Sequence, residues 1–208
     1  MREPQNGLSL RHTALVIVDL QHDFLSPGGA YDRGGAVSAE ARALPGRIEL
    51  LARRLKDAGG LVAASRFTLW PDAQGEPMIA AHLRTLRPFL CRGDFAPGSR
   101  GQATVDRLQP LVDVSVDKVA YSAFFSTQLD WVLSHAGIDT VVIAGIVTNG
   151  GVASTVRDAH AHEYHTFVLS DGCASFRAET HATALADLAT VAEVLDCQSL
   201  LSRWSSCP

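Results

Sequence analysis

The sequence predicts an α/β domain with a doubly wound parallel sheet and helices on both of its faces. Short apolar runs rich in β-branched residues have the composition of buried parallel strands. Most of these runs are separated by stretches with helical spacing, and this alternation indicates βαβ units with right-handed crossovers. The expected strands cover residues 13–20, 60–67, 113–120, 139–146, 165–172 and 192–197.

The stretches between these strands fall into two kinds. In residues 38–57, Leu44, Ile48 and Leu51 recur at helical spacing, and the glycine pair after this stretch is typical of a helix end. The segment 68–112 instead is rich in Pro and Gly with little periodicity, so we expect an insertion that covers a site. The other expected helices cover residues 126–136, 150–163 and 178–190.

Length and charge restrict the class of protein. A chain of 208 residues without repeats or linkers fits a single domain, residues 1–208. A net charge of −4 and the lack of a long basic run argue against nucleic acid or an anionic membrane as partner. The apolar runs are too short to cross a bilayer and the first residues lack an apolar signal core, so we expect a cytoplasmic enzyme.

The spacing of the cysteines does not indicate a disulfide framework or a metal site. Cys91, Cys173, Cys197 and Cys207 include no CxxC pair and no zinc-ligand spacing, so they are expected to be reduced thiols. Cys173 lacks a neighbouring base and is interpreted as a small buried apolar residue.

A single crevice is expected to collect the polar residues that end the strands, because ligands of such sheets bind beyond the carboxyl ends of the strands. Asp19 ends the first strand, where partial desolvation would raise its pKa and suit it to acid–base work, unless it is a helix cap or structural ion pair. Lys118 lies inside a predicted strand and is either an exposed edge residue or a buried partner of Asp19. Arg66, the turn 146–151 and Asp171 can face the same crevice.

Two further features allow a functional and a structural interpretation. Gly150 and Gly151 open a predicted helix, where backbone N–H groups attract anions, but the pair also suits a tight turn without a ligand. His160, His162 and His165 suggest a metal site, yet residues two apart on a helix do not face each other, so a metal is not expected there.

Three sequence blocks, in their order and spacing, resemble the isochorismatase-like hydrolase superfamily, which includes isochorismatases, nicotinamidases and N-carbamoylsarcosine amidohydrolases. The blocks are "ALVIVDLQHDFL", "DKVAYSAFFSTQLDWVL" and "GIDTVVIAGIVTNGGVASTVRDA". The resemblance implies a three-layer α-β-α fold with a six-stranded parallel sheet, usually assembled into homodimers or homotetramers. It also implies an Asp–Lys–Cys triad, in which Asp19 and Lys118 match the first two members.

The third member of that triad is absent. Where the family typically reads GxxTNxCVxST, this chain has Gly151, which has no side chain to form a thioester. The resemblance places a non-proline cis peptide between Val147 and Thr148. True isochorismatases also carry glycine at the position of Gly151, but after a Tyr-Ala-His-like sequence that this chain lacks. A laboratory Cys→Gly substitution would leave the same sequence.

The resemblance to nicotinamidases does not extend to their metal site. They place an Asp and two His ligands after the second strand, where this chain reads "SRFTLWPDAQGEPM" without histidine. We therefore expect neither zinc nor another cofactor, and a small molecule as the partner of the site.

Three functions are compatible with these residues. The first is metal-free, acid-assisted hydrolysis of a vinyl ether in a small anionic substrate, with Asp19 as the acid and Lys118 holding it. The second is C–N hydrolysis by a displaced nucleophile at Thr148, Ser154 or Cys173. The third is a ligand binder that has lost catalysis. The expected substrate contacts are an Arg66 clamp, an apolar wall of Phe24, Tyr121 and Phe124, and the turn residues Thr148, Gly150 and Gly151.

Overall fold

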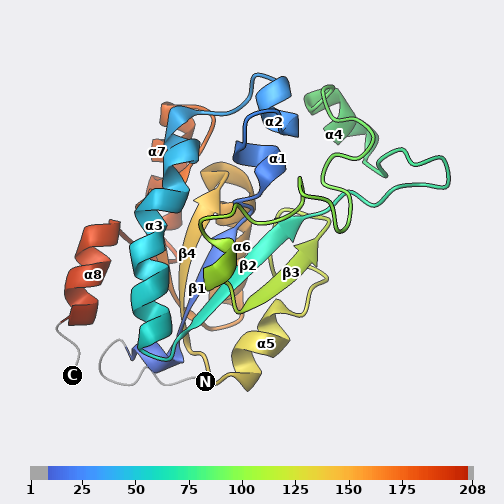
Figure 1. The fold of residues 1–208 in the computed structure, drawn as a ribbon. Coiled ribbons are helices and arrows are strands. Elements are labelled where there is room, and N and C mark those ends of the chain that lie inside the picture. Colours follow the sequence, from blue (N-terminus) through green and yellow to red (C-terminus); the bar gives the residue numbers. More distant parts are fainter. Residues whose placement is uncertain (1–8, 206–208) are drawn as a thin grey trace.

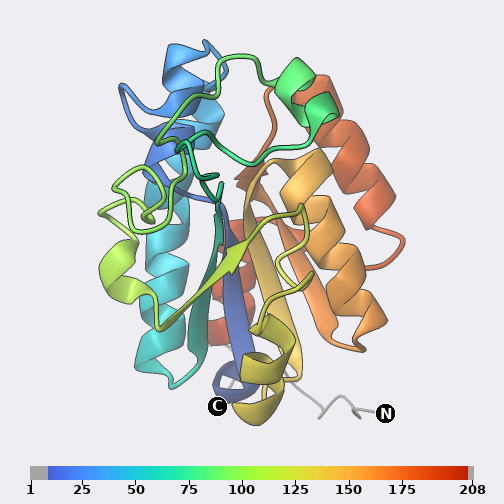
Figure 2. The ribbon, with the colours of Figure 1, turned by 90° about the vertical axis from the view of Figure 1, so that its right-hand side faces the viewer.

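The computed structural model describes residues 9–205 and contains a six-stranded parallel sheet with helices on both faces (Figures 1 and 2). The strand order is β3-β2-β1-β4-β5-β6, so the chain begins in the middle of the sheet and winds outward in both directions. This arrangement confirms the predicted three-layer, doubly wound α/β fold. The strands are β1 Thr13–Val18, β2 Leu61–Phe67, β3 Val114–Lys118, β4 Thr140–Ile146, β5 His165–Ala174 and β6 Glu193–Leu195.

The central strand β1 is buried on both faces, which explains its unbroken apolar sequence. Leu15 and Ile17 contribute to one hydrophobic core, and Val16 and Val18 contribute to the other. Parallel pairing places Val18 opposite both Ser65 of β2 and Gly145 of β4. The residue after Val18 therefore lies at the centre of the carboxyl edge of the sheet.

Two helical layers cover the sheet. The long helix α3, Ala39–Asp57, packs on one face together with α8, Cys197–Ser205 (Figure 1). Helices α5, α6 and α7 supply side chains to the core on the other face. Their bounds are Leu129–His135, Ala153–Ala161 and Ala178–Leu188.

Local signals account for where the helices begin and end. Ser38 caps α3, because its side chain accepts a hydrogen bond from the backbone N–H of Ala41 at 3.1 Å. After α3, Gly59 takes a left-handed conformation with a φ of +83°, as the expected helix end requires. The helix expected at 150–163 begins earlier and differently, as a π-helical turn over Thr148–Val152 that leads into α6.

The segment 68–112 lies over the carboxyl edge of the sheet (Figure 2). It contains helix α4, Ala81–Leu86, and a 3-10 turn, Gln109–Leu111, which its sequence did not predict. Leu90 and Phe95 from this segment form a separate small core with Tyr31. The remaining short elements are the 3-10 turn Leu10–His12 and the helices α1, His22–Leu25, and α2, Ala30–Arg33.

The state of the cysteines and the lengths of the helices bear on two of the expectations drawn from the sequence. Cys91, Cys173 and Cys197 are free thiols, and Cys207 lies outside the described residues. Among residues 9–205, every helix is too short or too polar to reach across a membrane.

Adjacent leucines of α3 test the assignment of its buried face. Leu51 is fully buried in the core between α3 and the sheet, whereas the side chain of Leu50 is 59% exposed. We expect Leu51→Ala to lower the free energy of unfolding by about 2–5 kcal/mol, because it leaves a cavity. The control Leu50→Ala should change it by less than about 0.5 kcal/mol. Urea denaturation followed by circular dichroism measures both, and equal losses would contradict the assignment.

Candidate active site

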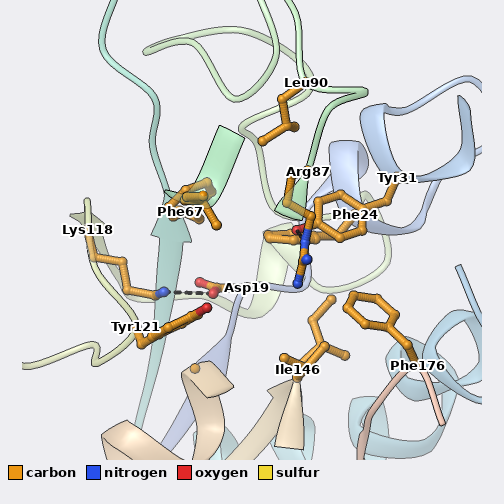
Figure 3. A pocket seen from close by; sticks show the side chains of 13 residues that line it. Asp19, Phe24, Tyr31, Phe67, Arg87, Leu90, Lys118, Tyr121, Ile146 and Phe176 are labelled. Atoms are coloured by element: carbon orange, nitrogen blue, oxygen red, sulfur yellow. Dashed lines mark hydrogen bonds and ion pairs between the residues drawn. The ribbon is translucent and has the colours of Figure 1, made fainter. Parts of the chain in front are cut away.

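A buried ion pair joins the two residues that the sequence singled out, Asp19 and Lys118. The Oδ2 atom of Asp19 lies 2.7 Å from Nζ of Lys118 (Figure 3), and Oδ1 accepts a hydrogen bond from the hydroxyl of Ser65 at 2.9 Å. Asp19 is 4% exposed and Lys118 is 2% exposed. The three residues come from the carboxyl ends of the neighbouring strands β1, β2 and β3, so the sheet itself positions them.

Lys118 is buried although β3 is the edge strand of the sheet. Its ammonium group also donates to the carbonyl oxygen of Ala120 at 2.9 Å and lies 5.6 Å from the ring centroid of Phe67. These contacts replace part of the hydration that burial removes. Of the two interpretations of this residue, the structure favours the buried partner of Asp19.

The surroundings of Asp19 change its acidity. Burial raises the pKa of the Asp19 carboxyl, and Lys118 and Ser65 oppose this rise by stabilising the charged form. The pKa remains above its ordinary value because removal from water is the largest effect. A partly desolvated carboxyl of this kind suits acid–base catalysis.

Gly151 faces the same carboxylate. A Cβ atom built on Gly151 would lie 3.3 Å from Oδ2 of Asp19 and 3.1 Å from both Val18 and the carbonyl oxygen of Ile146. Any side chain at this position would therefore point toward the Asp19–Lys118 pair. With glycine present, the corresponding space belongs to a pocket that Gly151 lines.

This pocket is small and mostly apolar. A water-sized group can move within about 60 Å³ of it, so it suits a small molecule. Asp19, Lys118, Phe24, Tyr121 and Gly151 line it as the sequence suggested. Ile146 and Val147 also line it, and they belong to the turn 146–151 that was expected to face the crevice. The lining residues that were not predicted are Tyr31, Phe67, Leu83, Arg87, Leu90 and Phe176 (Figure 3).

Three of the expected substrate contacts do not line this pocket. Arg66 alternates with Ser65 along β2, and its guanidinium pairs with Asp117 of β3 at 2.7 Å. Phe124 is buried in the core beneath α5 and α6. The hydroxyl of Thr148 is hydrogen-bonded to Nδ1 of His181 at 2.7 Å. The structure therefore places these three residues, and also Gly150, outside the lining of this pocket.

The turn after β4 also differs in detail from the prediction. The backbone N–H of Gly150 donates to the carbonyl oxygen of Val147 at 2.9 Å, so it is not free to bind an anion. The cis peptide bond lies between Ile146 and Val147, directly at the end of β4 and one residue before the expected position.

The other polar residues that the sequence singled out lie away from the Asp19–Lys118 ion pair. The carboxylate of Asp171 accepts a hydrogen bond from the backbone N–H of Cys197 at 2.8 Å. His162 stacks on Phe124, and His165 packs against Phe167. Among residues 9–205, no group of three or more His, Cys, Asp or Glu side chains is arranged to hold a metal ion.

Comparison with known proteins identifies the family. Residues 13–199 match the isochorismatase domain. The ureidoacrylate amidohydrolase RutB of Methylobacterium radiotolerans is 32% identical over 217 residues, covering 94% of this chain and 82% of that protein. The corresponding protein of Yersinia enterocolitica is 37% identical over 170 residues, covering 76% and 74%.

Solved structures agree with this result. The chain is similar to a cysteine hydrolase from Pseudomonas syringae pv. phaseolicola, with a TM-score of 0.82 and 27% identity over 99% of both chains. The parallel sheet and the Asp–Lys pair at its carboxyl edge define a hydrolase of the α/β class. The chain belongs to the isochorismatase family.

The ion pair can be tested through the stability of the protein. We expect Lys118→Met to lower the free energy of unfolding by about 3–5 kcal/mol, because it leaves the Asp19 charge buried without a partner. Arg157→Met removes the exposed ion pair with Asp187 and should cost less than about 1 kcal/mol. Urea denaturation at pH 7 measures both variants.

The double variant Asp19→Asn with Lys118→Met serves as the control for charge. It should recover part of the loss, since no unpaired charge then remains in the interior. If the two groups are not coupled, the losses in free energy of unfolding caused by Asp19→Asn and by Lys118→Met will simply add in the double variant. Such additivity would contradict the prediction.

Proposed function

We propose that this isochorismatase-family hydrolase works without a covalent nucleophile, with Asp19 transferring the proton and a water molecule attacking the substrate. The observation that carries the proposal is the placement of Gly151, which lines the pocket beside Asp19 and has no side chain that could act as a nucleophile. A water in the pocket next to Asp19 would be within reach of the carboxylate. Of the described residues that line the pocket, none is a cysteine, serine or threonine.

Hydrolysis of a C–N bond is the reaction that the relatives favour, since both similar curated proteins are named ureidoacrylate amidohydrolase. Asp19 would begin ionised, held in that state by Lys118, and remove a proton from water. The water oxygen would form a bond to the carbonyl carbon, and Asp19 would return the proton to the nitrogen as the C–N bond breaks. The products would be an amine and a carboxylic or carbamic acid.

Vinyl-ether hydrolysis is the second candidate, and the glycine at position 151 favours it because this reaction needs no covalent nucleophile. Here Asp19 would begin protonated, the form that burial favours. It would protonate the terminal alkene carbon, water would add to the resulting oxocarbenium ion, and collapse of the hemiketal would release a ketone and an alcohol. Both candidates use the same acid–base group and the same space for water.

The displaced nucleophiles considered above are less suitable than water. The hydroxyl of Thr148 is engaged by His181, and Ser154 is absent from the pocket lining. Burial raises the pKa of the Cys173 thiol to about 12, so it is not ionised at neutral pH. A side-chain nucleophile from these positions would need both activation and a route into the pocket.

Replacement of Asp19 tests the proposal directly. We expect Asp19→Asn to reduce kcat by about a hundredfold to ten-thousandfold, because the amide cannot transfer the proton. Asp117→Asn is the matched control, since Asp117 pairs with Arg66 outside the pocket and its loss should leave kcat nearly unchanged. Ammonia released from 3-ureidoacrylate after breakdown of the carbamate, and pyruvate released from isochorismate, are measured for each protein.

The products separate the possible functions. Ammonia favours C–N hydrolysis and pyruvate favours vinyl-ether hydrolysis. If Asp19→Asn retains the wild-type rate, Asp19 is not the acid–base group and the proposed function is wrong. If the wild-type protein releases neither product, the proposed function is also wrong and the protein is better described as a ligand binder.

A thiol reagent distinguishes water from a cysteine nucleophile. We expect activity to survive iodoacetamide treatment at pH 7, because Cys173 is buried and its thiol has a raised pKa of about 12. The Cys91→Ser variant controls for modification of the exposed thiol. Inactivation that persists in Cys91→Ser, together with loss of activity in untreated Cys173→Ala, would instead assign the nucleophile to Cys173.

A further inference from the structure

Arg87 brings a positive charge into the pocket from the segment that covers it. It follows helix α4, and its side chain extends between the aromatic residues that line the pocket (Figure 3). Its Nε atom donates to the hydroxyl of Tyr31 at 3.1 Å, and another guanidinium nitrogen donates to the carbonyl oxygen of Leu86 at 2.9 Å. The guanidinium lies 6.0 Å from the ring centroid of Tyr31 and 5.8 Å from that of Phe176. The group is therefore held in one place.

The charge of Arg87 has no counter-ion within residues 9–205. Among residues 9–205, no aspartate or glutamate forms an ion pair with it, whereas Arg33 and Arg66 pair with Asp94 and Asp117. Asp19 is paired with Lys118, so it does not compensate Arg87. A half-buried guanidinium among apolar groups gains most from an anion that can replace its lost hydration.

The neighbouring phenol provides a second donor. The oxygen of Tyr31 accepts the hydrogen bond from Arg87, which leaves its own proton available to a ligand. Burial raises the pKa of the Tyr31 phenol, so the group remains protonated at neutral pH. A planar guanidinium fork with an adjacent hydroxyl matches the two oxygens of a carboxylate.

We infer that Arg87 and Tyr31 bind the carboxylate of the substrate and select small, flat monocarboxylates. The aromatic side chains of Phe24, Phe67 and Phe176 line the space between this anion site and Asp19, and they suit an unsaturated, planar body. The inference rests on the proposed function for the reacting bond at Asp19, but the anion site itself is independent of turnover.

Binding of a matched ligand pair tests the anion site without catalysis. Crotonate and crotonamide have nearly the same shape and differ in charge, and calorimetry measures their affinities for the wild-type protein. We expect crotonate to bind about tenfold to a hundredfold more tightly than crotonamide. Arg87→Met should abolish this preference, Arg87→Lys should retain part of it, and Tyr31→Phe should reduce it.

Arg84→Met is the matched control in the same segment, because the Arg84 side chain donates to the carbonyl oxygen of Pro77 and does not line the pocket. It should keep the wild-type preference for crotonate. Equal affinities for the two ligands, no detectable binding of either, or a preference that survives Arg87→Met would overturn the inference.

Turnover gives a second measurement that separates this inference from the proposed function. With the substrate on which the wild-type enzyme is active, Arg87→Met should raise KM by about tenfold to a hundredfold and change kcat much less. If Asp19→Asn leaves turnover unchanged while the preference for crotonate depends on Arg87, the proposed function fails and the anion site stands.

Discussion

The buried ion pair between Asp19 and Lys118 is the constraint on which the architecture of the site depends. Two charges removed from water are tolerated only when they lie in contact and their remaining hydrogen-bonding groups are satisfied. Here three adjacent strands must end at the same level, because β1 carries Asp19, β2 carries Ser65 and β3 carries Lys118. The backbone of Asp19 takes a left-handed conformation, with a φ of 57°, where the chain leaves β1.

The fourth strand completes the site through close backbone approach. Gly145 has a φ of +129°, and a Cβ atom there would collide with the backbone of Val18. The end of β4 can thus lie directly against β1, and the turn that follows places Gly151 beside Asp19. Because the backbone sets this geometry, the absence of a side chain at position 151 changes which chemistry is possible and leaves the surrounding framework intact.

The residues at the carboxyl ends of the strands could be predicted from the sequence, whereas the other residues that surround them in the site could be predicted less well. Long apolar runs locate the ends of buried strands, and this is sufficient to bring Asp19 and Lys118 to one edge of the sheet. The alternation of side chains along β2 also shows that Ser65 and Arg66 cannot both face Asp19, a signal that the prediction for Arg66 did not use. Arg87 lies in an irregular segment without periodicity, so its position depends on tertiary packing that no local pattern encodes.

The two ends of the pocket are built from different parts of the chain, and this separates substrate selection from chemistry. The strands fix the acid–base pair, while Arg87 reaches the pocket from the segment that covers it. A carboxylate bound to Arg87 would orient the substrate so that its opposite end meets Asp19, with the aromatic walls restricting rotation. The covering segment makes no hydrogen bond to the ion pair, so the contact between Asp19 and Lys118 depends on the strands rather than on this segment. In the proposed mechanism the same pair would serve either hydrolytic route, and the geometry at Arg87 would decide which bond is presented to it.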